Sequence, residues 1–352
     1  MSYNKKAHLR ANIEAIRTVL ALERDGRAAT DDEKQIMQGY SGFGGLKCVL
    51  NPANSLADTS AWAKSELELF PLVAELHRVI RDNTPSEKEY RQYFSSIKNS
   101  VLTAFYTPPE IVQAIADAIK DSGIEINRFL DPSAGMGEFS KAFSNGNAEK
   151  FSFEKDILTG KLLSHLHPND KVKIEGFETI ENRYNNYFDM VSSNIPFGDI
   201  NVFDAAFSKN KDEVMRQSTK TIHNYFFVKG VESLREGGIM AFITSQGVMN
   251  SPNNEPVRKW LMENTNLVSA IRLPNNLFTD YAGTEVGSDL IVLQKNTGKE
   301  KLNFGEDLFI QSSQSGIYNS DYFYNHGRIV QNKASIGTDP YGKPAQVFLY
   351  EG

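Results

Sequence analysis

Cysteine is almost absent from this chain of 352 residues, since Cys48 is its only one. A single cysteine excludes an internal disulfide framework and a zinc site built from several thiolates, and it is typical of a reducing compartment. No uninterrupted apolar run reaches the roughly 20 residues that cross a bilayer. The N-terminus, MSYNKKAHLR, also lacks the apolar region of a signal peptide. We therefore expect a cytoplasmic protein with no membrane partner.

An excess of positive charge is also missing. The formal net charge is −6, which argues against a generally basic surface for nucleic acid, although a local basic surface is compatible with it. With 40% hydrophobic residues, the chain is long enough to bury the core of one large α/β domain with appendages. Composition therefore leaves the substrate open.

Signatures of phosphate binding are missing as well. The stretch RFLDPSAGMGEF, residues 128–139, predicts a strand that ends in a glycine loop and opens a helix, which is typical of a nucleotide-binding turn. It has no G-K-[ST] of a Walker loop, and Ser140 occupies the third glycine position of the dinucleotide fingerprint. Asp131, ahead of Gly135 and Gly137, would repel a pyrophosphate but can bind an ammonium group. An ordinary turn is the alternative for these residues taken alone.

Helical periodicity dominates residues 1–100, which we expect to form a helical N-terminal region. The segment YSGFGGL, residues 40–46, is too rich in glycine for regular structure. It predicts either a tight turn between helices or a lid or substrate-gripping loop that exposes Phe43.

Strands and helices alternate from Leu102 onward, which is the rhythm of a mostly parallel sheet. The expected strands are residues 127–130, 150–153, 171–174, 188–192, 238–244, 267–271 and 289–294. The last of them follows a loop too short for a crossover helix, so we expect it to be antiparallel. The sequence thus predicts an α/β domain with a mostly parallel seven-stranded sheet over residues 101–296, and an irregular extension over residues 297–352.

Acidic and aromatic residues follow the second and third expected strands. Glu154 ends the second strand, where a carboxylate can accept hydrogen bonds from both hydroxyls of a ribose. Phe177 and Glu178 come after the third strand and can offer an apolar face and an acceptor to an adenine ring. The alternative for Glu154 is an exposed loop residue.

The stretch FDMVSSNIPFGD, residues 188–199, predicts a strand that delivers Asn194 to its carboxyl end, where open α/β sheets bind ligands. The side-chain oxygen of Asn194 and the carbonyl oxygen of Ile195 can both accept from one exocyclic amino group. Pro196 stiffens the turn, and Phe197 can stack on a base. This chemistry needs no metal ion.

Two motifs, DPSAGMG and SNIPF, lie 63 positions apart from Asp131 to Asn194 and are preceded by FYTP. They resemble the S-adenosylmethionine and catalytic motifs of amino-methylating DNA methyltransferases, and the similarity extends from about Leu102 to Lys295. The motif order resembles the gamma group, which makes N6-methyladenine. GFGGL and SNIPFGD further resemble large methylases of bacterial mobile elements and phages, which are often joined to a helicase portion.

The resemblance implies a Rossmann-like methyltransferase fold and assigns roles by position. FYTP would hold the methionine carboxylate, Asp131 with the glycine loop the amino end, and Glu154 the ribose. The whole expected cofactor set is Phe105, Tyr106, Thr107, Asp131, Ser133, Gly135, Gly137, Glu154, Lys155, Phe177, Glu178 and Asn194. The target adenine would bind Asn194 through Phe197. Ile195 replaces the first of two prolines usual in the family, which could make the loop less rigid and lower the rate.

Basic residues follow the catalytic loop: Lys209, Lys211, Arg216 and Lys220. They form either a solvated face or, together with Phe197, a substrate-binding surface that grips phosphates while a base is flipped. Arg272 and Phe278 either border the pocket for the flipped base or pack in the core.

These observations predict an S-adenosylmethionine-dependent DNA methyltransferase that modifies adenine N6, as in restriction-modification. The same loop can serve cytosine N4, an RNA base or a protein glutamine. A second class of function is a cofactor-binding module that is inactive alone, because only about 57 residues follow IVLQK and this is short for a recognition domain. The expected partners are DNA and a recognition or helicase portion on the same or another chain.

Overall fold

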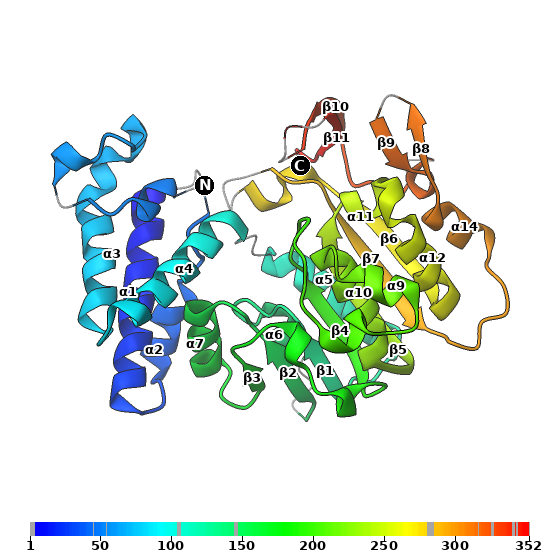
Figure 1. Ribbon diagram of the computed structural model, residues 1–352, viewed down its shortest axis with the longest axis horizontal. Coiled ribbons are helices and arrows are strands. Elements are labelled where there is room, and N and C mark those ends of the chain that lie inside the picture. The colour runs from blue at the N-terminus through cyan, green and yellow to red at the C-terminus, as the bar shows by residue number, and fades with distance from the viewer. Residues whose placement is uncertain are drawn as a thin grey trace.

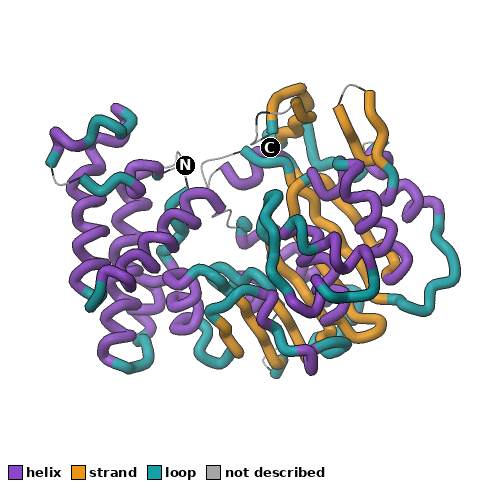
Figure 2. Tube along the Cα trace, in the orientation of Figure 1, coloured by secondary structure: helices purple, strands orange, loops and turns teal. Residues whose placement is uncertain are grey.

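The computed structural model describes residues 4–44, 46–53, 55–103, 107–143, 147–279, 285–315, 317–324, 327–339, 342 and 344–351. A group of N-terminal helices stands beside an α/β domain, and the C-terminal hairpins lie at one end of that domain (Figure 1). Figure 2 separates the almost entirely helical first part of the chain from the sheet that follows it. Within the part of the chain that the structure describes, no helix is long and apolar enough to cross a membrane.

The helical N-terminal region is confirmed. It contains α1 (Lys5–Asp25), α2 (Asp31–Gln38), η1 (Lys47–Leu50), η2 (Leu56–Asp58), η3 (Lys64–Leu69), α3 (Phe70–Asp82) and α4 (Glu87–Thr103). Helix α1 begins where the Asn4 side chain accepts from two backbone N–H groups and ends at Gly26, whose φ of 60° suits a residue without a Cβ. The apolar residues that recur every three or four positions along α1 are buried in one core with α3 and α4.

Phe43 is fully buried, contrary to the expectation of an exposed aromatic. The Gly42 carbonyl oxygen bonds to His8 Nε2 at 2.9 Å, and the Phe43 N–H donates to the Ser100 hydroxyl oxygen at 2.9 Å. Partners on α1 and α4, far away in the sequence, therefore hold the described part of this glycine-rich segment as a packed connection.

The predicted seven-stranded sheet is also confirmed. Its strands are β1 (Arg128–Asp131), β2 (Glu149–Phe153), β3 (Lys171–Lys173), β4 (Phe188–Asn194), β5 (Leu234–Ser245), β6 (Thr265–Leu273) and β7 (Ser288–Lys295). They are ordered β3-β2-β1-β4-β5-β7-β6. Neighbours from β3 to β5 are parallel, whereas β7 runs antiparallel to both β5 and β6. This is the Rossmann-like methyltransferase fold that the sequence predicted.

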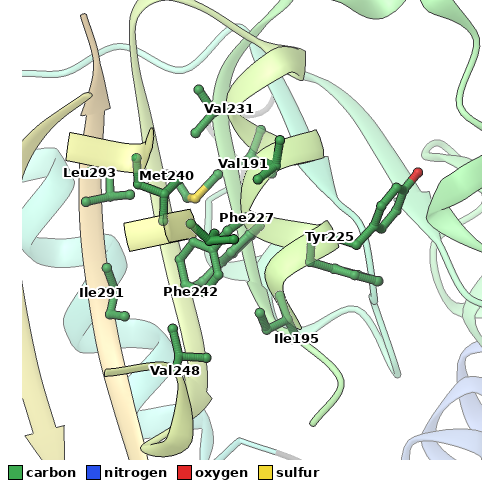
Figure 3. Close-up of a cluster of buried hydrophobic side chains, with 14 of the residues drawn as sticks. Val191, Ile195, Tyr225, Phe227, Val231, Met240, Phe242, Val248, Ile291 and Leu293 are labelled. Carbon is green, nitrogen blue, oxygen red and sulfur yellow. The ribbon is translucent and has the colours of Figure 1, made fainter. Parts of the chain in front are cut away.

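Helices cover both faces of the sheet. Helices α5 (Pro109–Asp121) and α6 (Glu138–Ala142) pack on one face, and α10 (Ile222–Ser233) and α12 (Glu255–Asn264) pack on the other. Figure 3 shows the second layer, where Phe227 of α10 meets Phe242 of β5 with ring centroids 5.3 Å apart. Burial of each such ring stabilises the fold by roughly 1.5–3 kcal/mol. Between β2 and β3, α7 (Ile157–Leu166) packs instead against the N-terminal helices.

The segment after Lys295 is more regular than its sequence indicates. It contains α14 (Phe304–Ile310) and two hairpins, one of β8 (Ser312–Ser315) with β9 (Ile317–Ser320) and one of β10 (Lys333–Thr338) with β11 (Pro344–Leu349). Phe309 and Phe323 join the core beside α10 and α12. Contacts with the main domain thus order a segment whose mixed polar composition gives little local signal.

Candidate functional site

The ends of β1 and β4 lie side by side at the carboxyl edge of the sheet. The two strands are parallel, with Leu130 opposite Val191. Just beyond this pair, the Ser193 hydroxyl donates to Asp131 Oδ1 at 2.7 Å. Asn194 follows Ser193 directly and ends β4. The two motifs singled out in the sequence therefore meet at one edge.

Asp131 is completely buried, and its two carboxylate oxygens differ in their hydrogen bonding. Oδ1 accepts from Ser193 and from the Ser133 N–H at 3.1 Å, whereas Oδ2 has no hydrogen-bond partner among the described residues. Burial raises the pKa of Asp131 to about 7, although the hydrogen bonds from Ser193 and Ser133 lower it. A buried acceptor without a donor fits a ligand that brings N–H groups, above all an ammonium.

The glycines of the loop after β1 meet two different needs. Gly135 and Gly137 have φ values of 54° and 86°, a region that strongly favours glycine. A Cβ on Gly137 would lie 2.5 Å from His167 Nε2, which bonds to the Met136 carbonyl oxygen at 3.1 Å. At the position where a dinucleotide fingerprint has its third glycine, the buried Ser140 donates to the Asp170 carboxylate. The loop is thus braced from behind by the α7–β3 connection.

Glu154 binds the glycine loop from the side of β2. Its Oε2 accepts from the Gly135 N–H at 2.9 Å, and its Oε1 accepts from the Asp156 N–H at 2.8 Å. Burial, with a contribution from the Asp156 charge, raises the pKa of Glu154 to about 7. Each carboxylate oxygen keeps a further acceptor site, so this half-buried residue can still receive hydroxyl groups.

The residues after β3 divide into one core residue and one ion pair. Phe177 is 1% exposed, and its ring packs against Phe153 and Phe226 with centroids 6.1 and 5.3 Å away. It therefore supports the hydrophobic core and offers no open face to an adenine ring. The half-buried Glu178 forms an ion pair with the exposed Lys155, with Oε1 and Nζ 3.1 Å apart.

Burial and a hydrogen bond hold the loop after β4. The Ile195 side chain is 1% exposed and belongs to the cluster drawn in Figure 3, and its N–H donates to the Ile243 carbonyl oxygen at 3.0 Å. A proline has no N–H and could not make this bond. Ile195, which stands where the family usually has proline, therefore fixes the loop through this hydrogen bond. Asn194, Pro196 and Phe197 are half-buried, and Phe197 packs against the cluster beneath α5.

Thr107 is the one residue of the predicted Phe105–Tyr106–Thr107 set that the structure describes, since Phe105 and Tyr106 lie outside the described residues. Thr107 precedes α5, which leads into β1 and so begins near the carboxyl edge of the sheet. Its side chain is buried, and its hydroxyl has no hydrogen-bond partner in the described part of the chain.

The basic residues after the Asn-Ile-Pro-Phe loop differ in their surroundings. Lys209, Lys211 and Lys220 are exposed around α8 (Ala205–Ser208) and α9 (Glu213–Ser218). Arg216, by contrast, donates to the carbonyl oxygens of Asn210 and Lys211 at 2.5 and 2.8 Å. It therefore closes the turn between the two helices.

Two exposed apolar residues shortly after the Asn-Ile-Pro-Phe loop were not singled out from the sequence. Ile200 is 51% exposed and Phe203 is 83% exposed. The signal was present in the sequence as apolar residues in a short polar connection, but exposure cannot be told from a single phenylalanine in a loop.

Arg272 and Phe278 are core residues, as one of the two alternatives held. Arg272 is 1% exposed and binds both carboxylate oxygens of the buried Asp289, at 2.8 and 3.0 Å. Phe278 is fully buried in the layer beneath α5.

The sheet order, with a glycine loop and an Asn-Ile-Pro-Phe loop at neighbouring strand ends, is that of a methyltransferase. The family model described as N-6 DNA Methylase matches residues 90–325, which is more than half of the chain. The chain belongs to this family.

A curated relative is the Defense against restriction protein B of Escherichia phage P1, which is 24% identical over 306 residues. The match covers 86% of this chain and 11% of that protein, so the chain spans about a ninth of the length of this relative. Among solved structures, a Listeria monocytogenes protein assigned to the class I S-adenosylmethionine-dependent methyltransferases is 17% identical, with 84% of this chain and 91% of that chain covered and a TM-score of 0.48. A type I restriction-modification methyltransferase subunit from Streptococcus thermophilus is 16% identical, with 82% and 78% covered and a TM-score of 0.45.

Proposed function

We propose that the protein transfers a methyl group from S-adenosylmethionine to the N6 amino group of adenine in DNA. The observation that carries this proposal is the hydrogen bond from Ser193 to Asp131, because it joins the cofactor loop to the strand end that presents Asn194. Membership of the N-6 DNA Methylase family supports the same reaction.

The residues at the edge of β1 and β2 fit the proposed cofactor. The unpartnered Oδ2 of Asp131 accepts from the amino group, and the remaining acceptor sites of Glu154 receive the ribose hydroxyls. The two carboxylates attract a ligand that carries positive charge. When bound, S-adenosylmethionine supplies an electrophilic methyl group.

The loop after β4 binds the amino group that is to be methylated. The Asn194 side-chain oxygen and the Ile195 carbonyl oxygen accept hydrogen bonds from its two N–H groups, which turns the nitrogen lone pair out of the plane of the base. Phe197 stacks on the base, and Pro196 limits the motion of the loop. Because the Ile195 N–H is bound to Ile243, the carbonyl oxygen is presented from a fixed backbone. Positioning is therefore the main catalytic contribution of these residues.

Exposed residues of the segment between the Asn-Ile-Pro-Phe loop and α10 bind the DNA. Lys209, Lys211 and Lys220 contact phosphates, which attracts DNA regardless of its sequence. Phe203, whose ring is 83% exposed, contacts bases beside the target after one base has left the stack. Arg216 contributes indirectly by holding this segment together. A recognition or helicase portion, on the same or another chain, selects the sequence.

The test is methyl incorporation by the purified chain. Adenine-containing DNA is incubated with S-adenosylmethionine labelled in its methyl group, and the digested nucleosides are identified by mass spectrometry. We expect labelled N6-methyladenine, and Asn194→Ala should reduce it about 100-fold or more because the acceptor nitrogen is no longer held. Asn182→Ala, an exposed position ahead of β4 at the opposite edge of the sheet, is the matched control.

Other outcomes would identify a different reaction. Label in N4-methylcytosine, in RNA or in a protein glutamine would replace the substrate. Cofactor binding without incorporation, restored by a separate recognition subunit, would identify a module that is inactive alone. A chain that does not bind S-adenosylmethionine would refute the proposal.

A further inference from the structure

A continuous series of hydrogen bonds connects α4 of the N-terminal region with the glycine loop. The Ser96 hydroxyl donates to the Asp156 carboxylate, and the Asp156 N–H donates to Glu154 Oε1 at 2.8 Å. Glu154 Oε2 in turn accepts from the Gly135 N–H at 2.9 Å. A helix outside the α/β domain is therefore linked through three bonds to the loop after β1.

Ser96 fixes the start of α7 with both functions of its hydroxyl group. Besides donating to Asp156, its oxygen accepts from the Leu158 N–H at 3.3 Å. Asp156 caps α7, because Oδ1 accepts from the Thr159 N–H at 2.8 Å. Ser96 is 3% exposed, so solvent water does not compete for its hydrogen bonds. The direction of the Asp156 N–H, and with it the position of the Glu154 carboxylate, depends on this arrangement.

Tyr40 and Phe43 of the glycine-rich segment are buried in the same core as Leu158 and Leu162 of α7. Tyr40 is 3% exposed, and burial raises the pKa of its hydroxyl group, with further contributions from the charges of Asp156 and Glu154. The Phe43 N–H donates to the Ser100 hydroxyl oxygen, so the segment is attached to α4 at a point separate from the contact of Ser96 with Asp156.

Apolar contacts reinforce the connection. Met136 of the glycine loop and Leu158 and Leu162 of α7 are buried in the same core as the N-terminal helices. Glu23 at the end of α1 also pairs with Lys161 and His165 of α7. The N-terminal helices thus hold both the glycine loop and the helix that follows Glu154.

We propose that the N-terminal helical region sets the affinity for the nucleoside part of S-adenosylmethionine by positioning Glu154, with Ser96 as its positioning residue. This inference rests on the proposed function, since it concerns the same cofactor. It adds that helices outside the α/β domain influence cofactor binding.

The test compares two serines of α4 in the full chain. Ser96 and Ser100 are both buried, at 3% and 7% exposed, and each accepts from one backbone N–H. Only Ser96 is bonded to Asp156. We expect Ser96→Ala to raise the dissociation constant of S-adenosylmethionine about tenfold in titration calorimetry, Ser100→Ala to leave it within about twofold, and Ser96→Thr, which keeps the hydroxyl group, to restore most of the affinity.

A double-mutant cycle separates positioning from a general structural role. If Ser96 acts through Glu154, then Ser96→Ala should have almost no further effect on binding in a Glu154→Ala background. Wild-type affinity in folded Ser96→Ala, or additive losses in the cycle, would overturn the inference and leave the proposed function intact. A wild-type chain that binds no S-adenosylmethionine would refute both.

Discussion

Asp131 shows at the scale of one residue how the site departs from what stability alone would favour. Its side chain is fully buried beside Ser193, yet Oδ2 has no partner among the described residues. An uncompensated buried carboxylate costs free energy, which a cationic ligand can recover. Under the proposed function, the amino group of S-adenosylmethionine supplies the missing partner.

The raised pKa of Asp131 predicts that cofactor binding weakens in acid. Only the carboxylate form attracts an ammonium, and the pKa of about 7 means that most of this form is lost by pH 6. The dissociation constant of S-adenosylmethionine should rise about tenfold between pH 8 and pH 6, as measured by titration calorimetry. Asp131→Asn should bind weakly and show a flatter profile. A wild-type profile parallel to that of the variant would contradict this assignment.

The same shift predicts the opposite trend for the stability of the free protein. The pKa of Asp131 is raised from 3.8 in the unfolded chain to about 7 in the folded one. Its contribution to stability is therefore complete below about pH 4 and is lost as the pH rises through 7, by an amount on the order of 4 kcal/mol. Relative to wild type, the melting temperature of Asp131→Asn should increase from pH 5 to pH 8 in scanning calorimetry.

At the scale of elements, the segment between β4 and α10 contains two kinds of basic residue, one bonded within the fold and the others exposed. Arg216 is used by the turn between α8 and α9, whereas Lys209, Lys211 and Lys220 face solvent. Helix α9 is tied to α12 by the bond from Trp260 Nε1 to Asp212 at 3.0 Å. These contacts hold the segment between β4 and α10 in place, with its three lysines exposed to solvent.

Removal of these lysines should weaken DNA binding without regard to sequence. For the triple variant Lys209→Ala, Lys211→Ala and Lys220→Ala, the slope of log affinity against log salt should fall by about 0.9 for each lysine that contacts a phosphate. The measurement is fluorescence anisotropy with two unrelated duplexes over a range of salt. The control is Lys120→Ala. Lys120 is exposed in the last turn of α5, at the end of this helix that is away from the carboxyl edge of the sheet. An unchanged slope would assign the lysines to a solvated face.

At the scale of the whole molecule, the N-terminal helices and the α/β domain share a core. Leu158 and Leu162 of α7 are buried among residues of α1, α3 and α4, although α7 connects strands β2 and β3 of the sheet. Loss of either part would expose the apolar side chains that the other part buries, which couples their unfolding. The helical region is thus an integral part of the fold.

Thermal unfolding should therefore occur in one transition. The chain has two tryptophans, Trp62 in the N-terminal region and Trp260 on α12. Variants Trp62→Phe and Trp260→Phe each leave one reporter, and their fluorescence transitions should coincide. Leu162→Ala should lower both by an amount that corresponds to about 2–5 kcal/mol, whereas Leu56→Ala, 63% exposed, should change neither appreciably. Separate transitions would show that the two parts unfold independently.

The sequence by itself determined the order of strands and helices, the antiparallel β7, the glycine loop and the Asn-Ile-Pro-Phe loop. These features could be predicted because they depend on local signals: apolar periodicity, turn residues and short motifs at strand ends. The parallel pairing of β1 with β4, which brings Asp131 beside Ser193, followed from the general behaviour of such sheets.

Only the tertiary structure decided how individual side chains are used. Phe43 is buried because α1 and α4 enclose its loop, Phe177 fills the core, and Arg216 is taken up by nearby carbonyl groups. The contact between Ser96 and Asp156 joins residues 60 positions apart. Burial and hydrogen bonding between distant segments depend on which surfaces meet when the chain folds, and no local pattern in the sequence records that.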